Sequence, residues 1–388
     1  MGIYISSTGG SELKKLKLMT VVGTRPELIR LSEIIKKADQ YFDQIFVHTG
    51  QNYDPRLNDI FYEDLGIRKP DIYLDAVGDN VGQTIGQIIS KSFDAMKAEG
   101  PDALLILGDT NSALCAISAK RLKIPIFHME AGNRCFDENL PEETNRRIVD
   151  HISDVNMPYT EHARRYLLME GFAKERIYVT GSPMREIIEA HEKEISGSRV
   201  LESLGLKEKG YIVLSAHREE NIDNEEHFLS LMHAVNAMAD TYQVPIIYSV
   251  HPRSAKFIKE RNFQFHELVR EMPPFNFSDY SALMRHSMCV VSDSGTMPEE
   301  AAVEHFPAVC IRTSTERPEA IDKGVFVLGN ISTESVLQSV NMSIGMAERG
   351  SFGECVPDYS PENVSDTVLR IIQGYVPIIN DRVWRKKG

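Results

Sequence analysis

Three carboxylates stand at or just after short apolar runs of the sequence, where acid and base chemistry could be placed. Asp109 follows Ala103–Leu107, Glu130 follows Ile124–His128, and Glu142 lies further on in a Pro-Glu-Glu string. Asp109 could be only the N-cap of a helix, and Glu142 could be a solvated residue of a helix start, where acids are favoured. Glu130 lacks such a role, because burying an unpaired carboxylate at an apolar strand end is costly. We interpret all three as candidate acid/base residues.

Basic side chains recur at similar positions. Arg25 lies in a Gly-Thr-Arg-Pro-Glu string after the first apolar run, His217 follows Tyr211–Ser215, and His251 follows Pro245–Val250. Such groups suit a diphosphate better than a metal, because no metal-type His, Cys and carboxylate spacing accompanies them. The first string is not a G-x-G-x-x-G fingerprint, so a nicotinamide cofactor is not favoured. Taken alone, that string could be a structural loop with a surface arginine, and a lone histidine is more often structural.

The second half of the chain adds a Ser-Gly turn and a charged loop. Ser294 and Gly295 open a predicted helix and could form an anion cradle. Glu300 comes one turn into that helix, where it could hold ribose hydroxyls. Arg312 begins a loop whose density of charge is unusual for solvation alone. These residues indicate a second set of ligand contacts.

Short apolar runs alternate with stretches of helical periodicity, which predicts parallel α/β sheets. The pattern restarts after Ser182, so we expect two Rossmann-like domains facing across a cleft, residues 1–182 and 183–363. A helix is expected within the polar stretch 185–209, and a final helix within 364–388 is expected to pack back on the first domain. The predicted strands are Leu18–Val22, Gln44–Val47, Ala103–Leu107, Ile124–His128 and Asp154–Met157, then Tyr211–Ser215, Pro245–Val250, Met288–Ser292, Ala308–Ile311 and Val325–Leu328.

Composition and charge argue against several classes of protein. A formal charge of −13 and a pI of about 5.5 do not favour nucleic acid or anionic lipid as a partner. The apolar runs are far shorter than the ~20 residues that span a bilayer. The first residues lack the apolar core of a secretion signal. Five scattered cysteines without a C-x-x-C pair are typical of reduced thiols. We expect a cytoplasmic protein without a membrane span or metal.

With these motifs the chain resembles the non-hydrolysing UDP-N-acetylglucosamine 2-epimerase family over nearly its whole length. The motifs are G-T-R-P-E (Gly23–Glu27), H-T-G-Q (His48–Gln51), G-D-T (Gly108–Thr110), E-A-G-x-R (Glu130–Arg134), P-E-E-x-N-R (Pro141–Arg146), H-R-E-E-N (His217–Asn221), D-S-G (Asp293–Gly295) and T-E-R-P-E (Thr315–Glu319). The resemblance implies a fold like that of the GT-B glycosyltransferases, UDP between the domains, no metal or other cofactor, and a homodimer.

The resemblance also implies roles for individual residues. Asp109, Glu130 and Glu142 would be the acid/base carboxylates, with His217 beside them. An aromatic residue near Phe277 could lie against uracil or could simply pack in the core. The expected UDP-sugar contacts are Arg25, Pro26, Arg134, Arg146, His217, His251, Phe277, Tyr280, Ser294, Gly295, Glu300 and Arg312.

Several positions depart from the glucosamine-type pattern of the family. Asn133 and Cys135 stand where Leu and Thr are usual, Thr296 replaces a Gly, Pro298 a Gln and Arg30 a Lys. These changes make the chain look most like the branch that inverts C2 of UDP-2-acetamido-2,6-dideoxy-L-talose, which gives UDP-N-acetyl-L-fucosamine for surface polysaccharides such as capsule or O-antigen. The strings 52–54, 135–139 and 156–162 support this branch. Regulation by UDP-N-acetylglucosamine is not expected, because Asn52 replaces a histidine.

The chemistry explains why such residues are needed. The C2 proton of an N-acetylhexosamine is not adjacent to a carbonyl carbon, but loss of UDP gives C1 oxocarbenium character and acidifies it. A carboxylate can then remove the proton to leave a 2-acetamidoglycal, and UDP is added back after protonation of the opposite face. A cationic clamp must retain the departed UDP. The alternatives are a UDP-N-acetylglucosamine/UDP-N-acetylmannosamine 2-epimerase, a hydrolysing epimerase, a GT-B glycosyltransferase, and a nucleotide-sugar sensor without catalysis.

Overall fold

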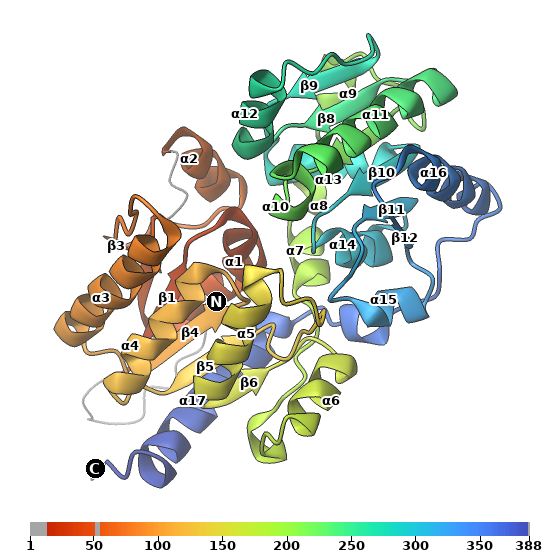
Figure 1. The fold of residues 1–388 in the computed structure, drawn as a ribbon. Coiled ribbons are helices and arrows are strands. Elements are labelled where there is room, and N and C mark those ends of the chain that lie inside the picture. The colour runs from red at the N-terminus through yellow and green to blue at the C-terminus, as the bar shows by residue number, and fades with distance from the viewer. Residues whose placement is uncertain (1–13, 51–54, 387–388) are drawn as a thin grey trace.

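Two six-stranded parallel sheets form the protein, which confirms the predicted α/β class. The computed structural model describes residues 14–50 and 55–386. The strand orders are β3-β2-β1-β4-β5-β6 and β12-β11-β10-β7-β8-β9, and the two sheets occupy separate halves of the molecule (Figure 1). The strands are β1 (Lys17–Val22), β2 (Asp43–His48), β3 (Ile72–Tyr73), β4 (Ala103–Leu107), β5 (Ile126–Met129), β6 (Val155–Met157), β7 (Ile212–Ser215), β8 (Ile246–Ser249), β9 (Val269–Met272), β10 (Cys289–Ser292), β11 (Ala308–Ile311) and β12 (Val327–Gly329).

All ten strands expected from the sequence are present, with ends shifted by up to two residues. Two strands are not among those predicted: β3, at one edge of the first sheet, and β9, at one edge of the second. The reason is visible in their residues: β3 is only Ile72–Tyr73, and β9 reads Val-Arg-Glu-Met with both polar residues exposed. Such short or half-exposed edge strands lack the apolar run that identifies a central strand.

Helices cover both faces of each sheet. The α-helices are α1 (Arg25–Tyr41), α2 (Pro55–Asp64), α3 (Val81–Glu99), α4 (Ala116–Arg121), α5 (Pro141–Ile152), α6 (Glu161–Met169), α7 (Met184–Ala190), α8 (Glu192–Ser196), α9 (Val200–Ser203), α10 (Glu219–Ile222), α11 (Glu225–Tyr242), α12 (Pro252–Glu260), α13 (Phe277–His286), α14 (Met297–Glu304), α15 (Pro318–Asp322), α16 (Thr333–Ala347) and α17 (Val364–Arg382). Short 3-10 helices are η1 (Asn111–Cys115), η2 (Lys174–Arg176) and η3 (Pro357–Tyr359).

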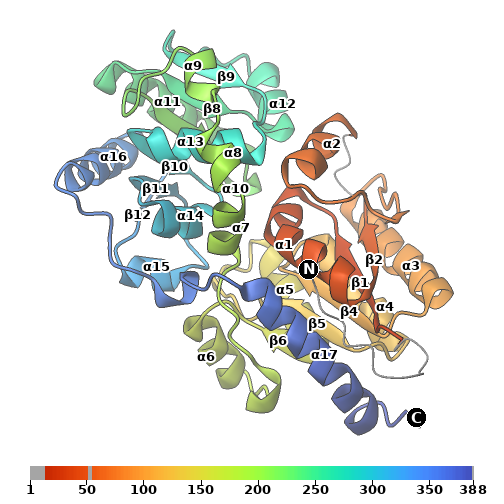
Figure 2. The same ribbon diagram turned by 180° about the vertical axis from the view of Figure 1, so that it is seen from behind.

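The end of the chain returns to the first sheet. Helix α17 packs against α1, and Figure 2 shows the two side by side. Helix α7 contacts both α1 of the first half and α14 of the second. The polar stretch 185–209 does not form the single helix expected, because α7, α8 and α9 are separated by His191 and by Gly197-Ser198-Arg199. The domain limits at residues 182 and 363 stay a prediction.

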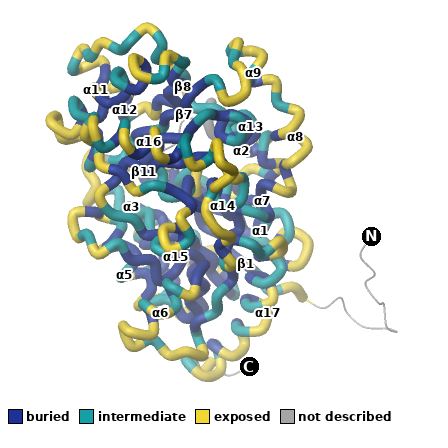
Figure 3. Tube along the Cα trace, turned by 90° about the vertical axis from the view of Figure 1, so that its right-hand side faces the viewer, coloured by how far each residue is buried: buried dark blue, intermediate teal, exposed yellow. Residues whose placement is uncertain are grey.

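The apolar interior is continuous between the two halves. One cluster joins Leu18 and Val22 of β1 to Val213 of β7 and Val290 of β10 through α1, α7, α14 and α17. Met19 and Val21, which alternate with those β1 residues, face a separate cluster with α3 and α4. This alternation is the period-2 pattern of a strand buried on both faces. Figure 3 shows buried residues running through both halves.

Part of one predicted motif lies outside the residues that the structure describes. Gln51 of the H-T-G-Q motif, the string 52–54, the lead-in 1–13 and residues 387–388 lie outside the described residues. Within the ranges 14–50 and 55–386, no helix combines the length and apolar character needed to cross a bilayer.

Candidate active site

A cavity of about 1160 Å³ lies between loops of the two sheets. Its walls come from segments that follow the carboxyl ends of β1, β4, β5, β7, β8 and β10, the edge at which parallel α/β sheets present ligand-binding loops. The structure brings most of the predicted site residues to this cavity. They are Arg25, Pro26, Asp109, Glu130, Glu142, His217, His251, Phe277, Tyr280, Ser294, Gly295 and Glu300.

Glu130 is held in an unusual conformation at the end of β5. Its φ of +60° is in the left-handed region, which a non-glycine residue occupies at a cost of about 1–3 kcal/mol. Gly108 leaves room for the Glu130 carboxylate, because a Cβ at position 108 would lie 3.0 Å from Glu130 Oε2. Arg30 donates to Oε2, and Arg317 Nη2 donates to Oε1 over 2.5 Å. Burial alone would raise the pKa of Glu130, but the two arginines hold that pKa below the usual range of a carboxyl group.

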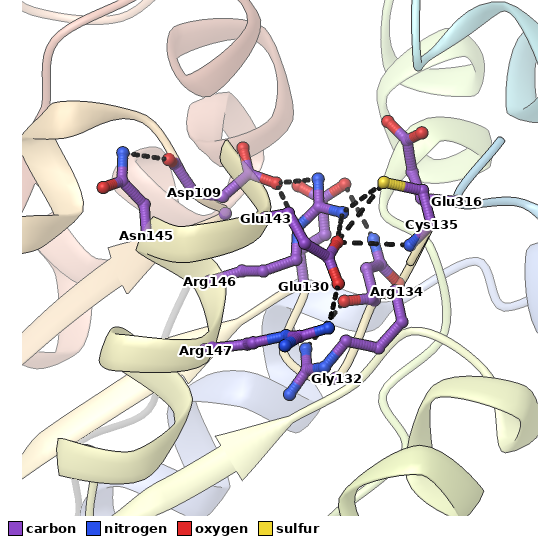
Figure 4. A network of polar contacts seen from close by, with 12 residues as sticks. Asp109, Glu130, Gly132, Arg134, Cys135, Glu143, Asn145, Arg146, Arg147 and Glu316 are labelled. Atoms are coloured by element: carbon purple, nitrogen blue, oxygen red, sulfur yellow. Dashed lines mark hydrogen bonds and ion pairs between the residues drawn. The ribbon is translucent and has the colours of Figure 1, made fainter. Parts of the chain in front are cut away.

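Asp109 and Glu142 line the cavity beside Glu130 in different surroundings. Arg146 donates to Asp109 Oδ2 through Nε over 2.9 Å and Nη2 over 2.6 Å, and its Nη1 donates to Glu143 (Figure 4). Glu142 has no described arginine within ion-pairing distance. Burial, and then the negative charge of Asp109, raise the pKa of Glu142. The cavity therefore presents Glu130, whose pKa is lowered, and Glu142, whose pKa is raised and which gains a proton more readily.

The second sheet contributes a histidine fixed by a buried carboxylate. Asp293 accepts hydrogen bonds from the backbone N of His217 and Arg218, both 2.9 Å from Oδ2. His217 Nδ1 lies 3.1 Å from Asp293 Oδ1, which leaves Nε2 as the other hydrogen-bonding atom of the ring. The rings of His217 and His251 lie 5.5 Å apart. Burial, followed by the neighbouring His217, lowers the pKa of His251 to about 4.

Other lining residues meet near the start of α14. Ser294 Oγ lies 2.9 Å from Thr296 Oγ1, and burial raises the pKa of Glu300 to about 7. A Cβ on Gly295 would lie 2.9 Å from Glu316 Oε1, so the glycine allows this side chain to approach. On the opposite wall, the Arg25 guanidinium lies 4.7 Å from the centre of the Phe61 ring.

Three residues expected to contact the ligand lie behind the cavity wall. Arg146 pairs with Asp109, so it holds a carboxylate in place. Arg134 is buried against Asp150 and Glu170, and Arg312 is buried against Glu316. None of the three is among the cavity-lining residues. Phe277 lines the cavity and also packs edge-on against His191, and its contact with uracil stays a prediction.

Several lining residues are not among the site residues predicted from the sequence. Arg218 and Arg253 line the cavity next to His217 and His251, and their place in the same strings was the available signal. Glu27 also lines it and accepts from the backbone N of Gly23 over 2.9 Å and of Thr24 over 2.7 Å. This contact shapes the turn that carries Arg25. In the described ranges, no group of three or more His, Cys, Asp or Glu side chains could hold a metal ion.

Comparison with known proteins gives one consistent family. The UDP-N-acetylglucosamine 2-epimerase family profile matches residues 35–373. The chain is 32% identical to the UDP-N-acetylglucosamine 2-epimerase of Methanocaldococcus jannaschii, over 85% of the chain and 92% of that protein. It is also 32% identical to the UDP-2,3-diacetamido-2,3-dideoxy-D-glucuronate 2-epimerase of Pseudomonas aeruginosa, over 85% of the chain and 93% of that protein.

Solved structures agree with this result. The structure of UDP-N-acetylglucosamine 2-epimerase from Rickettsia bellii is 43% identical in sequence, covers 96% of this chain and 100% of its own, and gives a TM-score of 0.89. MurG of Acinetobacter baumannii, 14% identical with a TM-score of 0.51 over 93% of this chain and 99% of its own, shares the fold alone. The expected GT-B-like architecture is confirmed.

Proposed function

The chain belongs to the UDP-N-acetylglucosamine 2-epimerase family, and we propose that it inverts C2 of UDP-2-acetamido-2,6-dideoxy-L-talose to give UDP-N-acetyl-L-fucosamine. The protein is an isomerase that acts at C2 of a UDP-linked N-acetylhexosamine. We propose in addition that the substrate is an L-sugar nucleotide and that the product is used in surface polysaccharide synthesis.

The proposed reaction type rests on which residues share the cavity. Asp109, Glu130 and Glu142 line the same cavity as Arg25 and His217, which come from opposite sheets. A nucleotide diphosphate held by the basic groups could leave C1 and stay bound while a carboxylate takes the C2 proton. A sensor would need only the clamp, and a glycosyltransferase would not need three acids beside it.

The different surroundings of the carboxylates suggest a division of roles. Glu130, held ionised by two arginines, suits the base that removes the C2 proton in one direction. Glu142, whose pKa is raised by burial and Asp109, suits the acid that protonates the other face. Because epimerisation is reversible, the two exchange roles in the reverse direction.

The L-sugar branch is supported by where the unusual residues lie. Arg30 pairs with Glu130, and Asn133 Nδ2 lies 3.3 Å from Glu130 Oε1. Cys135 Sγ lies 3.3 Å from Glu143 Oε2. Two of the positions that depart from the glucosamine-type pattern therefore contact the acid/base residue Glu130, and the third contacts Glu143, the neighbour of Glu142. Residues near the reacting carbon are where a sugar of the opposite configurational series would require change.

Proton NMR in D2O tests the proposal. The purified protein is incubated with UDP-2-acetamido-2,6-dideoxy-L-talose or, in parallel, UDP-N-acetylglucosamine, and deuterium at C2 and free UDP are followed. We expect deuterated UDP-N-acetyl-L-fucosamine with little free UDP. Exchange with the glucosamine substrate alone would retain the family reaction and exclude the L-sugar branch.

Two other outcomes identify the remaining alternatives. UDP released in step with substrate loss would indicate a hydrolysing epimerase. Absence of exchange with either sugar, in a sample that still binds UDP, would exclude both named substrates and direct the search to other UDP-sugars and then to a glycosyltransferase or sensor. The expected homodimer and cytoplasmic location stay predictions.

A further inference from the structure

Arg317 is a buried arginine that joins the two halves of the molecule. It lies in the loop between β11 and α15, on the side of the second sheet, and its side chain is 2% exposed. Its Nε and Nη2 atoms donate to Glu299 Oε1 over 2.9 and 2.6 Å. Nη2 also donates over 2.5 Å to Glu130 Oε1, which belongs to the first sheet. Glu299 alone already neutralises Arg317, so the contact with Glu130 is additional.

Glu130 is consequently bound from both halves. Arg30 of α1 donates to Oε2, and Arg317 donates to Oε1. Without Arg317, the only other described donor to Oε1 is the Asn133 amide, 3.3 Å away. A neutral amide at that distance stabilises a carboxylate much less than a guanidinium in direct contact. The charge on Glu130 therefore depends on an arginine from the opposite half.

We propose that Arg317 is a positioning residue that keeps Glu130 ionised and correctly directed, and that this state depends on the two halves lying together. The inference deepens the proposed function, because it concerns the same acid/base group. Arg317 does not line the cavity and is not proposed to touch the sugar. If the second half moved away, Glu130 would lose one of its two cations, so proton transfer is favoured only when both halves enclose the substrate.

The other charged and titratable groups near Glu130 define how the effect should be measured. Arg30 on α1 and Arg317 favour the ionised form, whereas Glu316 beside Arg317 opposes it. Glu299 on α14 competes with Glu130 for both arginines, since its Oε1 also lies 3.9 Å from Arg30 Nη2. Tyr159, which follows β6, is buried beside these charged side chains. Removing Arg317 or Glu299 should therefore affect Glu130 in opposite directions.

The test compares Arg317→Gln, Arg317→Lys and Glu299→Gln with the parent enzyme. C2 exchange is measured as kcat and kcat/KM against pH with the substrate that the parent turns over. A base is active when ionised, so its activity is lost as pH falls through its pKa. We expect the acid limb of Arg317→Gln to move to higher pH by about 1 unit or more. Arg317→Lys should move it less, and Glu299→Gln should move it to lower pH.

A second readout does not require turnover. Glutamate side chains labelled with 13C are titrated by NMR in each variant bound to UDP, and the Glu130→Gln spectrum assigns the Glu130 signal. A parent enzyme inactive on every UDP-sugar would reject the proposed function while leaving this titration decisive. An unchanged Glu130 titration in Arg317→Gln, or shifts of the same sign in Arg317→Gln and Glu299→Gln, would overturn the inference. If Arg317→Gln does not fold, the opposite shifts of Arg317→Lys and Glu299→Gln decide.

Discussion

Neighbouring carboxylates in this protein have different partners, so their substitutions should have different effects. Glu142 lines the cavity, whereas Glu143 next to it is buried against Arg146 and Arg147. We predict that Glu130→Gln and Glu142→Gln each lower C2 exchange by roughly 10²–10⁴-fold, the usual contribution of a general acid or base. UDP affinity, measured by calorimetry, should change little because the clamp is intact.

Glu143→Gln is the matched control for that prediction. It removes a carboxylate adjacent in sequence that does not line the cavity, so exchange should persist while thermal stability falls. Equal losses of exchange in Glu142→Gln and Glu143→Gln, or a loss of UDP affinity as large as the loss of kcat, would contradict the assignment of Glu130 and Glu142 to proton transfer.

At the residue scale, the sequence predicted types of side chain better than their partners. Asp109, Glu130 and Glu142 do share one cavity, as their place after strands indicated. Arg146 and Arg312 do not line it, because Arg146 is bound by Asp109, 37 positions away in the sequence, and Arg312 by the buried Glu316 of its own loop. Whether an arginine faces a ligand depends on such pairings, which are set by the packing of several elements and leave no local pattern.

At the scale of elements, the loop after β5 is fixed against α6 by a glycine. Gly132 has φ +78°, and a Cβ there would lie 2.5 Å from the Ala163 carbonyl oxygen and 2.8 Å from Leu167 Cγ. We predict that Gly132→Ala lowers the free energy of unfolding by about 2–4 kcal/mol, from left-handed strain and overpacking together. Urea unfolding measures this. Because Glu130 is two residues away, C2 exchange should fall as well.

Gly100→Ala separates the two contributions. Gly100 ends α3 with φ +59°, and a Cβ added there would meet no atom of the described residues within 4 Å, so only the left-handed strain of about 1–2 kcal/mol applies. Similar destabilisation of the two variants would show that contact with α6 is unimportant. The sequence did mark Gly132 within a motif, but it could not identify α6 as the reason, since that contact spans more than thirty residues.

At the scale of the whole molecule, α2 of the first half meets α13 of the second beside the cavity. Asp64 Oδ2 accepts from the backbone N of Phe277 over 2.8 Å, and Oδ1 accepts from Ser278 Oγ over 2.9 Å. Phe61 on α2 and Phe277 on α13 both line the cavity. Periodicity predicted the two sheets, but a hydrogen bond between residues 213 positions apart has no sequence signal. The contact therefore joins the start of α13 to α2 beside the cavity and helps the two halves to enclose a ligand there.

We predict that Asp64→Ala weakens that enclosure. Asp64 accepts from the first N–H groups of α13 in addition to the N-cap residue Asn276, and loss of a capping acceptor costs about 1 kcal/mol. The same free energy should shift the equilibrium between the arrangement in which the two halves lie together and the one in which they lie apart. KM for the UDP-sugar should then increase about fivefold, and kcat should change less. Asn80→Ala is the control, because Asn80 caps α3 through Gln83 N over 3.0 Å within the first half alone. It should lower the melting temperature similarly and leave KM unchanged. Equal KM values in the two variants would mean that Asp64 only stabilises α13, and that contacts such as Arg317–Glu130 suffice to hold the halves together.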